Sequence, residues 1–111
     1  MREKIIRPYR DDRTVQVIKE LAMNFMERES NRASLVTVTN VILSDRAKRA
    51  TILFSVLPED KASAVEEFAN RKKDEFRDYV KKNSRLGIIP FFDFKIDLGE
   101  INRQNIDSLL K

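Results

Sequence analysis

The stretch Pro90-Phe-Phe-Asp-Phe-Lys-Ile-Asp97 is the part of the sequence that decides the fold. Apolar and polar side chains alternate along it, so that Phe92, Phe94 and Ile96 share one face. This period of two residues is typical of a strand that covers an apolar core on one side. Gly87, shortly before the stretch, marks a turn that leads into it. The stretch is therefore predicted to be a strand with one buried face.

A long helix is predicted before this strand, from about Glu59 to Asn83. Pro58 and the acidic residues after it suit a helix N-terminus. A 3.6-residue period through the apolar positions falls on Lys72. A lysine on an apolar face either extends its ammonium group past the core or marks a bend that turns it outward. Of the two, we expect the bend. The apolar positions are Val65, Phe68, Ala69, Phe76, Tyr79 and Val80.

The first half of the chain predicts one helix and two strands. Asp11 or Asp12 can cap a helix in which apolar residues recur at spacings of three and four up to Phe25. The β-branched runs 35–43 and 50–57 are separated by a short charged connection, as in an antiparallel hairpin. The predicted order is α, β, β, α, β within one domain of residues 1–111, with a short closing helix in residues 100–111.

Composition argues against catalysis. The chain of 111 residues contains no histidine and no cysteine, which are the commonest general base, zinc ligand and reactive nucleophile. We therefore expect no enzyme activity, no catalytic residues, no cofactor and no metal. The N-terminus is charged and no apolar stretch is long enough for a signal peptide or a membrane span, so we expect a cytoplasmic location.

Positive charge is concentrated in residues 71–87. This segment holds seven basic and three acidic residues, and its excess of four equals the net charge of the whole chain. Phosphates attract such a surface, and arginine adds stacking and bidentate hydrogen bonds. The alternative is a solvated helix face with exposed ion pairs between neighbouring turns. The candidate RNA-binding residues here are Arg71, Lys72, Lys73, Arg77, Lys81, Lys82 and Arg85.

Four further features carry weaker hypotheses. The connection between the first two strands supplies Arg46, Lys48 and Arg49 as a second set of phosphate contacts, unless it is merely a polar turn. Phe91 lies on the opposite strand face from the core positions and is expected to be exposed or to pack against a helix end. Asp93 and Asp97 share that face, but two carboxylates alone make a weak metal or acid–base pair. A basic arm, residues 1–10, precedes the first helix.

The order and spacing of short motifs resemble the ribosome-binding factor A family over about 80 residues. Val36-Thr-Val-Thr-Asn-Val-Ile-Leu-Ser44 fits the family pattern V-T-V-T-x-V-x-x-S, and Ala50-Thr-Ile-Leu-Phe-Ser55 fits the strand after it. The later positions fall in the family register without a gap. They are Arg77, Arg85, Leu86, Pro90, Phe92, Phe94 and Asp97.

The sequence departs from the family at three places. Arg46 stands where the family has an acidic residue, and Gly87 stands where it has a second arginine. Lys72 and Asp74 replace the alanine and glycine at which the long helix of the family bends. The last departure removes the residues at which the family helix bends and with which its RNA contact is associated.

The resemblance implies an α+β fold of the type II KH-like kind, α-β-β-α-β with a kinked second helix and a three-stranded sheet backed by helices. It lacks the GXXG loop of most KH domains. It also implies a non-catalytic assembly factor that binds the immature small (30S) ribosomal subunit and assists late maturation of the 5′ end of 16S rRNA. The implied partners are 16S rRNA and that subunit, with no membrane or small-molecule substrate, and the free protein is expected to be a monomer.

Two other functions stay open from the sequence. One is a protein-interaction module of the same fold whose basic helix binds an acidic protein partner. The other is a nuclease, against which the absence of histidine and cysteine argues.

Overall fold

The computed structural model describes residues 11–29 and 33–99, and within these ranges it confirms the predicted helices and strands. The elements are α1 (Asp12–Glu29), β1 (Leu35–Ser44), β2 (Arg49–Leu57), the short 3-10 helix η1 (Glu59–Lys61), α2 (Ala62–Arg71), α3 (Lys73–Asn83) and β3 (Phe91–Ile96). The predicted long helix is therefore two helices, α2 and α3, that meet at Lys72. The basic arm of residues 1–10 and the closing helix of residues 100–111 lie outside the described residues.

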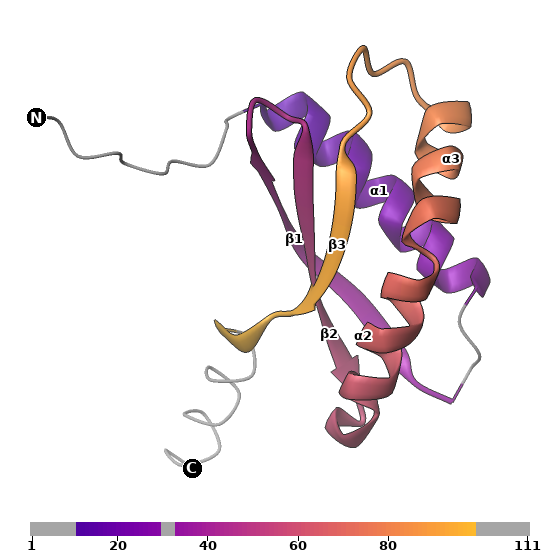
Figure 1. The fold of residues 1–111 in the computed structure, drawn as a ribbon. Coiled ribbons are helices and arrows are strands. Elements are labelled where there is room, and N and C mark those ends of the chain that lie inside the picture. The colour runs from indigo at the N-terminus through magenta and orange to yellow at the C-terminus, as the bar shows by residue number, and fades with distance from the viewer. Residues whose placement is uncertain (1–10, 30–32, 100–111) are drawn as a thin grey trace, which may run out of the picture.

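The three strands form one sheet in the order β1-β2-β3 (Figure 1). The strands β1 and β2 pair antiparallel through a tight turn, and β2 and β3 pair parallel. Parallel pairing requires a crossover that returns the chain to the same end of the sheet, and here η1, α2 and α3 make this crossover. The start of β3 is consequently brought beside the start of β2.

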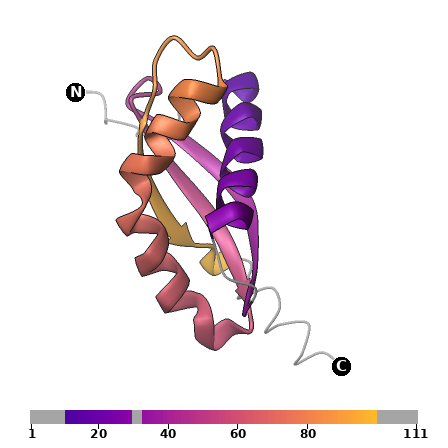
Figure 2. The ribbon, with the colours of Figure 1, turned by 90° about the vertical axis from the view of Figure 1, so that its right-hand side faces the viewer.

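The helices α1, α2 and α3 cover the same face of the sheet (Figures 1 and 2). Burial alternates along β2 as expected for this arrangement, since Ala50, Ile52, Phe54 and Val56 are buried and the residues between them are more exposed. The other face of the sheet carries no helix among the described residues. The predicted α+β architecture, with a three-stranded sheet backed by helices, is therefore confirmed.

Phe76 of α3 is at the centre of the core. Its ring centroid lies 4.7 Å from that of Phe92, 5.2 Å from that of Phe25 and 5.6 Å from that of Phe94. These contacts join α3 to both α1 and β3, and edge-on or tilted ring pairs of this kind add to the stabilisation from burial. Phe68, also expected in the core, is only half-buried and lies outside the core cluster.

Asp11 caps the first helix, as the sequence predicts. The Thr14 N–H donates to Asp11 Oδ1 at 3.1 Å, and the Thr14 hydroxyl donates to Oδ2 at 2.7 Å. These hydrogen bonds lower the pKa of the Asp11 carboxyl, the side-chain bond from Thr14 being the largest cause. The cap fixes where α1 begins.

The helices of residues 11–29 and 33–99 are all too short or too polar to cross a membrane.

Candidate RNA-binding surface

A left-handed turn connects β1 to β2. Asp45, Arg46 and Ala47 have φ angles of 50°, 54° and 69°, and the Lys48 N–H donates to the Asp45 carbonyl at 3.0 Å. This conformation costs residues other than glycine about 1–2 kcal/mol each. Burial of Ala47, which is 7% exposed, holds the turn against the core. The turn therefore presents Arg46 and its basic neighbours to solvent at one end of the sheet.

Two basic residues of α3 reach the start of β3. Lys73 Nζ lies 3.4 Å from Asp93 Oδ1. One turn further along, the Arg77 guanidinium donates to the carbonyls of Pro90 and Ile89, both at 3.1 Å. Arg77 thus has a structural task, because it satisfies backbone carbonyls of the segment that leads into β3.

Phe91 joins the two predicted sets of basic residues. Its backbone N–H donates to the Lys48 carbonyl at 2.9 Å, and it is the pairing partner of Arg49 in the neighbouring strand. The Arg77 guanidinium carbon lies 4.4 Å from the centroid of the Phe91 ring. The turn residues and the α3 residues are therefore neighbours in space, although they are far apart in the sequence.

We call this region the basic end. It lies where the β1–β2 turn, the start of β3 and the connection after α3 come together (Figure 1). Lys81 continues the row of Lys73 and Arg77 along the helix, because residues four apart share a helix face. Arg85 is exposed in the connection that follows. The basic end comprises Arg46, Lys48, Arg49, Arg77, Lys81, Arg85 and Phe91.

Four predicted RNA-binding residues lie outside the basic end, and one of them, Lys73, is paired with Asp93 at the start of β3. Arg71 pairs with Glu67 at 3.3 Å on the exposed side of α2. Lys82 lines a polar groove between α1 and α3 together with the carboxylates of Glu75 and Asp78. Lys72 belongs to the bend and pairs with Glu75. These positions fit the alternative of a solvated helix face better than they fit the basic end.

The helix bends at Lys72, as the sequence predicts. The backbone of Lys72 leaves the helical region, with φ −99° and ψ 5°, while its N–H still donates to the Ala69 carbonyl at 3.0 Å. The side chain turns outward to Glu75, with 3.5 Å between Nζ and Oε1. Alanine and glycine are thus not required for the bend, which forms here with Lys72 and Asp74 at those positions.

Two side chains of α2 that the sequence did not single out close the outer edge of β3. The Asn70 amide accepts from the Phe94 N–H at 3.0 Å and donates to the Phe94 carbonyl at 2.9 Å. Glu66 Oε2 accepts from the Ile96 N–H at 2.9 Å. These bonds occupy backbone groups that would otherwise be free to pair with another strand. The signal in the sequence was only a polar residue next to the apolar stripe.

The carboxylates of β3 serve structural contacts. Asp93 pairs with Lys73, and Asp97 Oδ2 accepts a hydrogen bond from the Thr39 hydroxyl at 2.6 Å. Thr39 is at the irregularity in the β1–β2 register, which lies between Val38 and Asn40. No group of three or more potential metal ligands occurs among residues 11–29 and 33–99.

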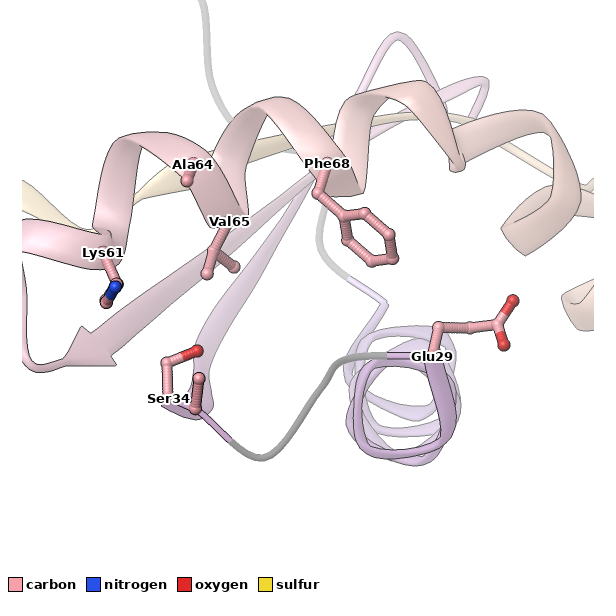
Figure 3. Close-up of a pocket in the computed structure, with 7 residues that line it drawn as sticks. Glu29, Ser34, Lys61, Ala64, Val65 and Phe68 are labelled. Carbon is pink, nitrogen blue, oxygen red and sulfur yellow. The ribbon is translucent and has the colours of Figure 1, made fainter.

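A separate pocket lies at the opposite end of α2 from the bend (Figure 3). Val65, Phe68 and Ala64 form its apolar side, and Lys61, Glu29 and Ser34 lie around it. Ala33 completes the lining. The half-buried Phe68 side chain forms part of the wall of this pocket, which lies between α2 and the end of α1. None of the predicted RNA-binding residues lines it.

Comparison with known proteins agrees with the motifs. The model of the family described as ribosome-binding factor A matches residues 10–110. A protein of that name from Thermodesulfovibrio yellowstonii is 30% identical over 109 residues, covering 96% of this chain and 92% of the relative. Another, from Geobacter metallireducens, is 31% identical over 105 residues, covering 92% of this chain and 89% of the relative.

Solved structures support the same assignment. The solution structure of a Thermotoga maritima protein described as a ribosome binding factor A has a TM-score of 0.65 and 28% identity, covering 78% of this chain and 86% of that one. The crystal structure of ribosome-binding factor A from Thermus thermophilus has a TM-score of 0.67 at 19% identity, covering 79% of this chain and 97% of that one. At this identity the likeness supports the KH-like fold alone. The chain belongs to the ribosome-binding factor A family.

Proposed function

We propose that this protein binds the immature small (30S) ribosomal subunit through 16S rRNA and assists late maturation of the 5′ end of that rRNA without cutting it. Family membership supports the ribosome as the partner, since the relatives are named for binding it. The observation that carries the proposal is the convergence of the turn and α3 cations around Phe91. On this proposal the protein works in the cytoplasm and is a monomer when free.

The charges of the basic end are available to phosphates. Arg46, Lys48, Arg49, Lys81 and Arg85 form no ion pair with the described carboxylates, in contrast to Arg71, Lys72 and Lys73. Cations that are not neutralised by the protein can displace counterions condensed on RNA, which gives affinity that falls as salt rises. The rigid turn and the packed α3 hold these charges at fixed spacing, so less ordering is required on binding.

Binding without cleavage fits the chemistry of the side chains. The chain has neither histidine nor cysteine, and the carboxylates Asp93 and Asp97 are engaged with Lys73 and Thr39. A binding factor would instead act by holding one rRNA conformation, so that nucleases reach the precursor end.

The test is co-sedimentation with immature small-subunit particles at increasing salt. The double variant Lys48→Glu and Arg49→Glu should lose most of its binding at low salt, because each reversal replaces attraction to phosphate by repulsion. The matched control is Lys19→Glu with Lys61→Glu, which changes the net charge equally but lies outside the basic end, and it should sediment as the unmodified protein does. Equal losses in both variants would contradict the assigned surface.

Maturation is tested separately in cells depleted of the protein. Primer extension should show 16S rRNA precursors with an extended 5′ end, and the Lys48→Glu, Arg49→Glu variant should fail to restore the mature end. Normal 5′ ends in depleted cells would reject the maturation role and leave the binding role to the sedimentation assay.

A further inference from the structure

Phe91 is the exposed aromatic residue of the basic end, and its position is not explained by folding. It is 60% exposed, whereas Phe92 and Phe94 of the same strand are 3% and 1% exposed. Full burial of a phenylalanine side chain contributes about 1.5–3 kcal/mol, and Phe91 forgoes a large part of it. A ring in this position is therefore a candidate for contact with a ligand.

The ring is held in place on one side. Arg77 lies over it at 4.4 Å, and the two hydrogen bonds to the Ile89 and Pro90 carbonyls keep the guanidinium in position. The backbone of Phe91 is fixed by its bond to the Lys48 carbonyl. Phe91 and Arg77 thus form a fixed cation–π pair with much of the ring exposed to solvent, and a planar ligand group can stack on the ring at little entropic cost.

The charged residues around the Phe91 ring indicate which kind of planar ligand would stack on it. Arg49, directly opposite Phe91 in the sheet, and Lys48 beside it are exposed and form no ion pair with the described carboxylates. On the same face the next residue of β3 is Asp93, which is polar and paired with Lys73. An apolar protein surface would gain little here. A nucleotide strand fits better, because its base can stack on the ring while its phosphates contact the cations.

We propose that Phe91 is a stacking platform for one unpaired nucleobase of single-stranded RNA, with Arg49 and Lys48 placed to contact the adjoining phosphates. The inference rests on the proposed function, and it specifies that the rRNA segment at the basic end is single-stranded. Arg77 is a positioning residue in this site, because its Nε and Nη2 groups donate to backbone carbonyls and it acts through the ring.

The absence of tryptophan from the sequence permits a direct test. The variant Phe91→Trp carries a single indole at the platform, and stacking of a base on it should quench its fluorescence. The probe is oligoadenylate of about ten nucleotides, which covers the usual footprint of a single-stranded site. An oligomer of equal length without bases should not quench. The control is Met23→Trp, an exposed position on α1, which should be insensitive to both oligomers.

Substitution separates stacking from charge. Phe91→Ala and Phe91→Leu should each weaken oligoadenylate binding about tenfold, while Phe91→Tyr keeps it. The slope of affinity against salt should be unchanged in all three variants, because no phosphate contact is removed. Thermal melting should show all of them folded, since the side chain is exposed.

The outcomes distinguish this inference from the proposed function. The platform is rejected and the proposed function stands if three results are found together. The unmodified protein sediments with small-subunit particles, Phe91→Ala sediments with equal affinity, and oligoadenylate does not quench the fluorescence of Phe91→Trp. If the unmodified protein does not sediment with the particles, the proposed function is rejected. Equal quenching by the base-free oligomer would also reject the platform, because charge alone would then account for the signal.

Discussion

Asp11 shows how one side chain couples the first helix to pH. Its pKa is lowered in the folded protein by hydrogen bonds from Thr14, which favour the ionised carboxylate. A lowered folded-state pKa means that the cap contributes stability above the unfolded pKa of about 3.9 and loses that contribution as pH falls through the folded value.

We therefore expect Asp11→Ala to lower the melting temperature near neutral pH, with the difference from the unmodified protein shrinking at acid pH. Melting followed by circular dichroism from about pH 7 to pH 2 measures this. Asp11→Asn is the control, since asparagine also caps helices but does not titrate. A difference between Asp11→Ala and the unmodified protein that is constant with pH would contradict the assigned role.

Phe68 and Phe91 show at the same scale where hydrophobicity alone misleads. Both are phenylalanines in apolar patterns, yet Phe68 lies on the wall of a pocket and Phe91 is exposed on the open face of the sheet. The strand period correctly assigns Phe91 to the face opposite the core, because side chains alternate strictly. The helix period places Phe68 on the apolar stripe, but the structure leaves it half-buried at the pocket wall, although its neighbour Ala69 is fully buried.

At the scale of elements, β3 depends on α2 for its outer edge. The Asn70 amide satisfies both the N–H and the carbonyl of Phe94. Asn70→Ala should lower the free energy of unfolding by about 2 kcal/mol, because backbone groups lose their partners. Asn83→Ala removes an exposed helix-end hydrogen bond and should cost less than about 0.5 kcal/mol.

Denaturant unfolding measures both changes, and amide hydrogen exchange localises the effect. Exchange at Phe94 should accelerate in Asn70→Ala more than exchange in β1, which is far from the substituted edge. Unchanged exchange at Phe94 would show that water replaces the amide and that the edge is not closed by Asn70.

At the scale of the whole molecule, Phe76 ties the helices to the sheet. Its side chain is fully buried and contacts rings from α1 and β3. Phe76→Ala should cost about 3–5 kcal/mol, the usual range for removing a buried ring. Phe68→Ala, outside the core, should cost about 1 kcal/mol, since only part of its surface is buried.

Urea unfolding of the two alanine variants compares these costs directly. Equal destabilisation would mean that Phe68 contributes to the same core as Phe76, contrary to its half-buried position.

Local sequence patterns predicted most of the fold. The alternation in residues 90–97, the β-branched hairpin strands and the Asp11 cap are set by neighbours in the chain, so each can be recognised without knowing the rest of the structure. Lys72 in the apolar stripe predicted the bend for the same reason. The basic residues were recognised as a class, but their number alone did not show which of them share a surface.

The sequence by itself determined the elements, the buried faces of the strands, the bend at Lys72 and the family motifs, because these depend on residues a few positions apart. Only the tertiary structure decided which cations act together. The parallel crossover places Phe91 beside Arg49 and under Arg77, while Arg71, Lys72 and Lys82 are left near carboxylates. That outcome depends on contacts between residues distant in sequence, which no local period encodes.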